Sequence, residues 1–136
     1  MKLIGAILMG ILSSATQALD AQAMQTLNAY AQGTQHQDMA QLEGAFHKDF
    51  RVVAMTADGL RVIDRDSYLA LIKAKKIGGH KRTLNVNQVI EGDNLIQVSL
   101  TLRGENAIFH DHLDLIKQDA SWQILHNSTQ IEAINQ

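Results

Sequence analysis

The sequence predicts an α+β domain in which the helices come first and a long antiparallel meander comes last. The last third of the chain holds three consecutive strand-like segments separated by tight turns: Asn94–Arg103, Asn106–Lys117 and Trp122–Ile131. Apolar and polar residues alternate in the first of them, which is typical of a strand with one buried and one exposed face. Helices followed by a meander predict a sheet that carries its helices on one face.

Two helices are predicted at the start of the domain. Asp20 can cap a helix over Ala21–Gln32, where apolar residues recur at helical spacing, and Gly33 is the type of residue that ends a helix. Asp38 can cap a second helix over Met39–Phe46. The remaining short elements therefore have to fit between this helical pair and the meander.

A hairpin and a third helix fill that interval. The strands are predicted over Phe50–Met55 and Leu60–Ile63, with a glycine-containing turn between them. Either Asp64 or Asp66 can cap the helix that follows, Ser67–Lys76.

The first strand of the final sheet is predicted over Arg82–Ile90. Its apolar residues change parity between Val86 and Val89, which indicates a β-bulge. This strand and the three strands of the meander therefore follow one another along the chain without a helix between them.

Composition limits the possible functions. The chain has 136 residues, which suits one domain, and 46% of them are apolar, enough for a buried core. The formal net charge of −2 argues against nucleic-acid binding, because phosphate contacts need a surplus of cations. There is no cysteine, so disulfide and thiolate chemistry are excluded.

One basic stretch stands out against this charge. It comprises Lys73, Lys75, Lys76, Lys81 and Arg82. A solvated helix end, where cations suit the helix dipole, is favoured over an anion-binding site.

Residues 1–18 predict a secretory signal peptide. Lys2 gives a positive start, and the apolar run Leu3–Leu12 is shorter than the about 20 residues that span a bilayer. Small residues follow, and cleavage after Ala18 would leave residues 19–136 as the mature domain. No cysteine follows that point to carry a lipid. We therefore predict a periplasmic or secreted protein without a stable membrane anchor.

A spaced set of residues resembles a known family. The pattern Y-x2-G-x4-D-x3-L-x3-F-H-x-D is formed by Tyr30, Gly33, Asp38, Leu42, Phe46, His47 and Asp49. A second pattern is formed by Phe109, Asp111, Leu113, Leu115, Trp122 and Ile124. Both are similar to the putative lumazine-binding group of the nuclear transport factor two-like superfamily. His126 and Ser128 also resemble the polar endings of its polyketide-cyclase-like relatives.

The resemblance implies a particular architecture. It is a cone-like curved antiparallel sheet with three helices on its concave face, in the order α-α-β-β-α-β-β-β-β. The superfamily contains both enzymes and binding proteins, so the likeness gives a fold and not one activity. One departure is Asp119-Ala120 at the last turn, where the family usually has Asp-Gly, because alanine resists a positive φ.

The length of the last hairpin loop decides which side chains share the concave face. A four-residue loop, Gln118–Ser121, keeps the apolar faces of both strands together. Its register places Leu115 opposite Ile124, Leu113 opposite His126 and Asp111 opposite Ser128. A three-residue loop would instead pair His112 with His126.

The four-residue register predicts a pocket with a catalytic pair. Asp111 and His126 would be a carboxylate and an imidazole in a partly dry site, which suits general acid–base chemistry. The alternative is a pair of polar groups that satisfy each other for structural reasons alone. The other residues predicted to line the pocket are Tyr30, Tyr68, Phe109, Leu113, Trp122, Ile124 and Ser128.

One further pattern has metal-ligand character. His110, His112 and Asp114 alternate on one face of a strand, and His-x-His can hold zinc or copper. Along a straight strand the three side chains are too spread out for one ion, so a polar outer face is favoured. No metal site and no other cofactor is predicted.

Three functions are compatible with these patterns. We favour an exported domain that binds a small apolar or aromatic molecule without catalysis. The alternative is a small lyase or isomerase, of the ketosteroid isomerase or polyketide-cyclase kind, that uses Asp111 and His126. The third is a dimeric protein-interaction module. The resemblance implies a homodimer, and its candidate surface on the outer sheet face is Gln97, Ser99, Thr101, His110 and His112.

Overall fold

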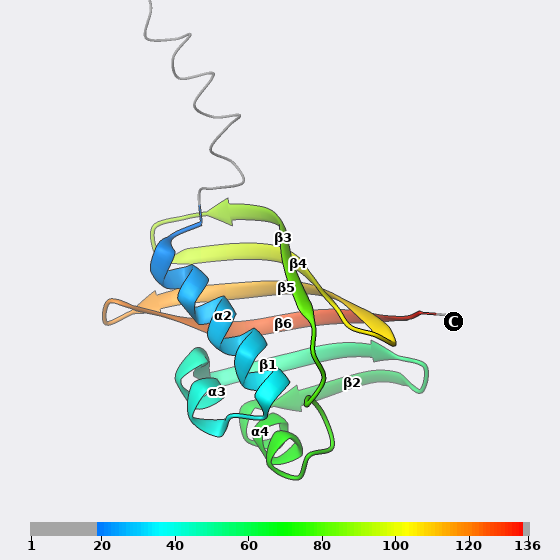
Figure 1. Ribbon diagram of the computed structural model, residues 1–136. Coiled ribbons are helices and arrows are strands. Elements are labelled where there is room, and N and C mark those ends of the chain that lie inside the picture. Colours follow the sequence, from blue (N-terminus) through cyan, green and yellow to red (C-terminus); the bar gives the residue numbers. More distant parts are fainter. Residues whose placement is uncertain (1–18, 135–136) are drawn as a thin grey trace, which may run out of the picture.

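A computed structural model describes residues 19–134, in which three helices pack on one face of a six-stranded sheet (Figure 1). The elements are α2 (Ala21–His36), α3 (Met39–Ala45), β1 (Phe46–Thr56), β2 (Gly59–Asp64), α4 (Arg65–Lys73), β3 (Thr83–Glu91), β4 (Leu95–Arg103), β5 (Ala107–Gln118) and β6 (Ser121–Ala133). Their order confirms the predicted fold class. The predicted signal peptide lies outside the described residues, so its cleavage stays a prediction.

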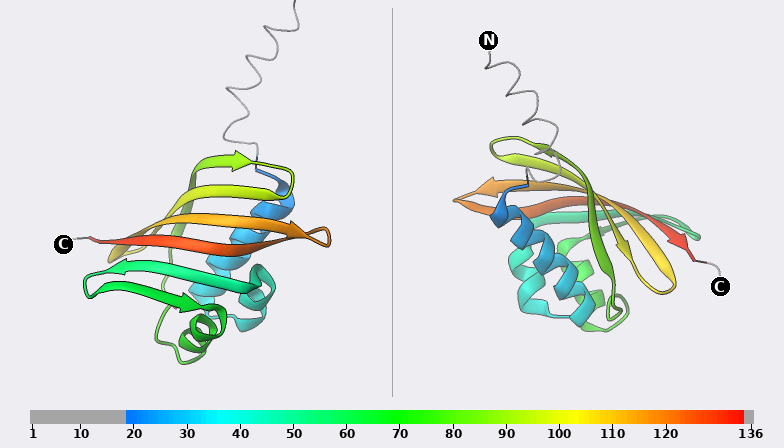
Figure 2. Two further views of the ribbon diagram at one scale, coloured as in Figure 1. Left: turned by 180° about the vertical axis from the view of Figure 1, so that it is seen from behind. Right: turned by 45° about the horizontal axis from the view of Figure 1, so that its top comes forward.

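The sheet is curved and open, with its helices on the concave side (Figure 2). Its strand order is β2-β1-β6-β5-β4-β3. Neighbouring strands are antiparallel except β1 and β6, which run parallel, so the sheet is mixed and not antiparallel throughout. Within residues 19–134, no helix combines the length and the apolar character needed to cross a membrane.

The predicted helix starts are confirmed by capping hydrogen bonds. The Asp20 carboxylate accepts from the backbone N–H of Gln22 at 2.7 Å, and the Asp38 carboxylate from Gln41 at 3.2 Å. Asp64, and not Asp66, caps α4, because its carboxylate accepts from the Ser67 N–H at 2.8 Å. These bonds satisfy amide groups that have no partner inside the helix.

The predicted end of α2 at Gly33 is wrong. The helix continues to His36, and Gln37 ends it with a left-handed φ of 54°. Gly33 is instead needed for packing, since a Cβ there would lie 2.8 Å from the side chain of Leu42. The glycine therefore lets α2 and α3 approach closely.

Aromatic rings fill the core between the helices and β1. The rings of Phe46 and Phe50 stack with their centroids 3.9 Å apart. The ring of Tyr68 on α4 meets both edge-on, at 5.4 and 5.8 Å. Such offset and edge contacts are favourable beyond the burial of the rings, so they fix α4 against β1.

The predicted register of the last hairpin is correct near the turn and wrong beyond it. The turn has two residues, Asp119 and Ala120, both with positive φ, and Leu115 faces Ile124 as expected. Leu125 then has no partner in β5, because a bulge shifts the ladder by one residue. The pairs beyond it are Leu113 with Asn127 and Asp111 with Thr129.

Candidate functional site

A cavity of about 380 Å³ lies between the concave face of the sheet and the helices. Three residues predicted for the pocket line it: Tyr30 from α2, Tyr68 from α4 and Phe109 from β5. Val52 and Ala54 of β1 add apolar wall. The volume is within the range of about 300 to 1,000 Å³ that is usual for small-molecule sites.

A buried hydrogen-bond chain lies beneath the cavity. The Tyr30 hydroxyl donates to Oδ2 of Asp111 at 3.0 Å and accepts from Nδ2 of Asn127 at 3.2 Å. Asp111 is 1% exposed and Asn127 is 2% exposed, so both depend on protein partners. Tyr30 and Asn127 line the cavity. Asp111 does not line it and is linked to it through the Tyr30 hydroxyl.

Burial sets the ionisation of this chain. Loss of solvent raises the pKa of Asp111, and contacts with Thr129, Tyr30 and Asn127 offset part of that rise. Loss of solvent also raises the pKa of Tyr30 well above its usual value, and the nearby Asp111 adds to this effect. Both groups are therefore shifted towards their protonated, neutral forms.

Several polar atoms at the cavity wall have no well-formed hydrogen bond to another described residue. They are Oγ1 of Thr34, Oδ1 of Asn127 and Oγ1 of Thr129. The three residues are 3%, 2% and 9% exposed. The three atoms have almost no accessible surface, so other atoms of these residues form the polar part of the cavity wall.

Residues 74–82 connect α4 to β3 and form the mouth of the cavity. They are tied to the end of α2, because the backbone N–H of Gly79 donates to the Thr34 carbonyl at 3.0 Å and Gln37 Nε2 donates to the Ile77 carbonyl at 3.1 Å. Gly78 has a φ of +78°, and a Cβ there would lie 2.4 Å from the Thr34 carbonyl oxygen. Only glycine allows this approach.

The predicted Asp111–His126 pair is not formed. Because of the bulge at Leu125, His126 and Ser128 point to the outer face of the sheet, opposite Asp114 and His112. Asp111 faces the helices as predicted.

The other predicted pocket residues also lie outside the cavity. Leu113 and Ile124 are buried in the core, at 1% and 0% exposure. Trp122 lines a different hollow, a shallow groove of about 440 Å³ between α2, α3 and the tip of the last hairpin. We place the site in the smaller cavity because that is where buried aromatic and polar groups converge.

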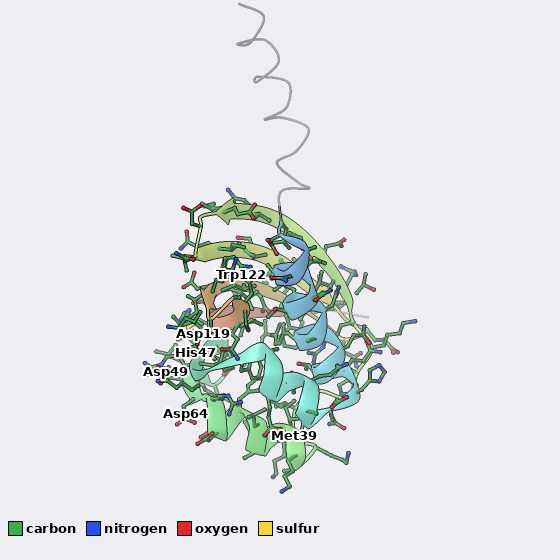
Figure 3. The ribbon with its side chains drawn as sticks, turned by 90° about the vertical axis from the view of Figure 1, so that its left-hand side faces the viewer. Met39, His47, Asp49, Asp64, Asp119 and Trp122 are labelled. Atoms are coloured by element: carbon green, nitrogen blue, oxygen red, sulfur yellow. The ribbon has the colours of Figure 1, made fainter. Side chains whose placement is uncertain are left out.

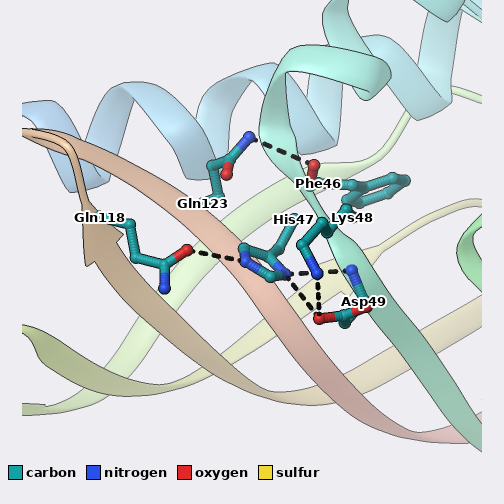
Figure 4. Close-up of polar contacts among 6 residues, drawn as sticks. All are labelled: Phe46, His47, Lys48, Asp49, Gln118 and Gln123. Atoms are coloured by element: carbon teal, nitrogen blue, oxygen red, sulfur yellow. Dashed lines mark hydrogen bonds and ion pairs between the residues drawn. The ribbon is translucent and has the colours of Figure 1, made fainter.

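His47, a residue of the family pattern, has a structural position. Its Nδ1 accepts from the Asp49 backbone N–H at 3.0 Å, so its Nε2 carries the proton and donates to Oε1 of Gln118 at 2.9 Å (Figure 4). Gln123 adds a bond to the Phe46 carbonyl. His47 and Asp119 lie at the same end of the molecule (Figure 3). The imidazole thus fastens the start of β1 to the last hairpin.

The outer-face histidines have separate partners. Nε2 of His110 lies 2.8 Å from a carboxylate oxygen of Glu132, and Nδ1 of His112 lies 2.9 Å from Oγ of Ser99. Among residues 19–134 no three His, Asp or Glu side chains are grouped as they would be around a metal ion.

Sequence reasoning missed Thr34, Asn127 and Thr129 at the cavity wall. A signal for Asn127 and Thr129 was present in the sequence. The apolar residues Trp122 and Ile124 have even numbers, whereas Ile131 has an odd number, so the inward-facing positions change parity between them. A change of parity of this kind in β3 correctly predicted the bulge after Val86.

The fold and the cavity define a nuclear transport factor two-like protein. A profile of the family described as "putative lumazine-binding" matches residues 18–128. The chain belongs to this family. No curated protein matches the sequence significantly.

Solved structures of low sequence identity share the fold. A nuclear transport factor two-like protein of unknown function from Silicibacter pomeroyi is 17% identical, with a TM-score of 0.71 over 79% of this chain and 90% of that one. A similar protein of unknown function from Methylobacillus flagellatus is 16% identical, with a TM-score of 0.71 over 88% and 99%. One from Shewanella baltica is 13% identical, with a TM-score of 0.70 over 85% and 93%.

Proposed function

We propose that the protein is an exported binding domain for a small apolar or aromatic molecule, held in the cavity beneath α2 and α4. The observation that carries this proposal is the convergence of Tyr30, Tyr68 and Phe109 on a cavity of about 380 Å³. Aromatic walls with a few polar groups favour a flat or partly apolar ligand. The family description adds lumazine as one molecule to try.

Native mass spectrometry of the freshly purified protein tests the proposal. We expect a small molecule to accompany the protein and to be lost on denaturation. An Ala54→Met variant fills the cavity and should carry none, whereas Ala70→Met on the exposed side of α4 should retain it. Equal retention by both variants would contradict binding in this cavity.

Export is tested separately. Expression of the full chain in a bacterial host should yield a periplasmic protein whose sequence begins at Leu19. Recovery of the uncleaved chain in the cytoplasm would contradict the proposed signal peptide.

A lyase or isomerase activity is the second candidate. It is favoured by the Tyr30 hydroxyl, which lines the cavity and is hydrogen-bonded to the buried carboxyl of Asp111. Tyr30, backed by Asp111, would then replace the predicted Asp111–His126 pair as the proton-handling group. Under this proposal Asp111→Asn abolishes turnover while ligand binding is kept.

We also propose a homodimer through the outer sheet face. On β1 and β2 this face exposes Met55, Leu60 and Val62 at 53, 61 and 58%. Exposed apolar residues that adjoin one another favour an interface. A Val62→Glu variant should sediment as a monomer under conditions in which the wild type is a dimer, and a wild type that is monomeric at high concentration would contradict the proposal.

A further inference from the structure

We propose that the molecule bound in the cavity is an acid: an apolar body that carries a carboxylate or phosphate group, which Arg82, Arg61 and Lys76 recognise at the mouth. This inference rests on the proposed binding function and names the chemical class of the ligand.

The charged residues of the cavity lining favour an anion. Arg61 from β2, Lys76 from the segment before β3, and Arg82 all line it, and His80 lies beside them. Among the described residues that line the cavity there is no Asp or Glu. The whole chain has a net charge of −2, so this group of cations runs against the overall balance. Clustered cations on the wall of an apolar hollow attract an anion more strongly than the same charges on an open surface.

The position of Arg82 also favours an anion. Its guanidinium carbon lies 4.1 Å from the centre of the Phe109 ring, which also lines the cavity. This stacking fixes the guanidinium plane at the wall. The Nε of Arg82 is buried and has no well-formed hydrogen bond to a described residue. A planar guanidinium held at the cavity wall suits a two-point contact with an oxyanion.

Two carboxyl groups lie near Arg82, whereas Arg61 and Lys76 have no carboxyl group beside them in the cavity lining. Asp111 lies beneath Tyr30, where burial raises its pKa, and it interacts electrostatically with Arg82. Glu105 lines a smaller hollow together with Arg82 and Phe109. Since no Asp or Glu of the described residues lines the main cavity, its lining keeps a net positive charge.

The cavity wall also has a charged part and an uncharged part. The cations come from β2 and from the segment between α4 and β3, whereas Asn127 and Thr129 come from β6, at the centre of the sheet. The uncharged wall between them includes Val52, Ala54 and Tyr68. A molecule that contacts both parts has an apolar body, a polar group that reaches the sheet and an anionic group beside the cations.

A matched pair of probes tests the inference. Isothermal titration calorimetry should show that 1-naphthaleneacetate binds the purified protein about tenfold more tightly than 1-naphthaleneacetamide, which has the same body without the charge. The preference should weaken as salt is added, since screening reduces exposed cation–anion attraction. Tighter binding of 1-naphthyl phosphate than of the acetate would support the inference and assign a phosphate; the reverse order would support it and assign a carboxylate.

Variants locate the effect. Arg82→Gln should remove most of the preference for the anion, measured as the ratio of acetate to amide affinity in the same variant. Arg61→Gln and Lys76→Gln, which alter exposed side chains and leave the fold intact, should each reduce the preference by a smaller factor. Arg103→Gln, an exposed cation at the end of β4 that does not line the cavity, is the matched control and should behave as wild type.

The outcomes separate this inference from the proposed function. Equal binding of the acetate and the amide by the wild type would overturn the acidic ligand and leave the binding function standing. A preference that persists in all three cavity variants would also overturn it. If neither probe binds and no molecule accompanies the purified protein, the proposed function and this inference both fail.

Discussion

The hydroxyl of Tyr30 and the carboxyl of Asp111 meet at 3.0 Å although 81 positions separate them in the chain. This contact joins α2 to the centre of the sheet, and Asn127 completes it from β6. The wall of the cavity is therefore supported by a polar chain that has little access to water, and its protonation is coupled to folding.

Replacement of Asp111 by Asn should change how stability depends on pH. The folded-state pKa of Asp111 is raised, so the carboxyl contributes stability that is fully present below its unfolded pKa and lost as pH rises through the folded value. The Asn variant cannot ionise and should not lose it. Urea unfolding from pH 3 to 8 should show that the free energy of unfolding of the variant increases relative to that of the wild type as pH rises.

The control for this experiment is Asp93→Asn, which alters an exposed carboxyl in the turn between β3 and β4. It should follow the wild-type pH profile. A constant difference between Asp111→Asn and the wild type at every pH would contradict the coupling.

Removal of the Tyr30 hydroxyl should destabilise the fold. Tyr30→Phe leaves buried groups of Asp111 and Asn127 without their partner, which costs about 1–3 kcal/mol in the free energy of unfolding. In an Asp111→Ala background the same change should cost clearly less, because one partner is already gone. Additive costs in the double-mutant cycle would show that the contact contributes little.

The Asp119–Ala120 turn contains avoidable strain. Ala120 adopts a φ of +66°, which disfavours any residue with a Cβ. Ala120→Gly should therefore raise the free energy of unfolding by up to about 1 kcal/mol. Ala70→Gly is the control with the opposite expected effect. Ala70 is an exposed residue in the middle of α4, and glycine there should lower the free energy of unfolding by about 1 kcal/mol. Melting temperatures that fall in both variants would contradict the assigned turn.

Gly78 should not tolerate a side chain. Gly78→Ala places a Cβ against the Thr34 carbonyl and forces a positive φ, so residues 74–82 must move away from α2. We expect lower stability and weaker binding of 1-naphthaleneacetate, because Lys76 and Arg82 move with the segment. Gly44→Ala in α3 meets no atom within 4 Å and should be neutral or stabilising. Unchanged binding in Gly78→Ala would show that this segment does not form the site.

The imidazole of His47 is expected to be structural. His47→Ala removes bonds to Gln118 and to the Asp49 backbone at a position that is 7% exposed, and should cost about 1–3 kcal/mol. His36→Ala, on the exposed end of α2, should change stability by less than about 0.5 kcal/mol. Ligand binding should be unaffected in both variants, as judged by calorimetry.

The elements of the fold could be predicted because their signals are local. Asp20, Asp38 and Asp64 mark helix starts, and alternation marks the strands. Gly33 misled the prediction of a helix end because its role depends on Leu42, a residue of another helix. The parallel pairing of β1 with β6 is likewise a long-range feature with no local signal.

The site was predictable only in part. Tyr30 and Tyr68 reach the cavity from the helices, and Phe109 and Asp111 face the helices from β5, as predicted. His126 and Ser128 do not, because one unpaired residue reverses the faces of β6 from that point on. The cations of the cavity could not be assigned from sequence, since a solvated helix end was the favoured interpretation of Lys76 and Arg82.

Leu125 therefore decides the chemical character of the interior. An uninterrupted ladder, in which Leu125 paired with Asp114, would exchange the inner and outer rows of β6 beyond it. An imidazole and a serine hydroxyl would then replace an amide and a threonine beside the buried acid. The bulge, and not the residue types of β6 alone, therefore determines which polar groups lie beside Asp111.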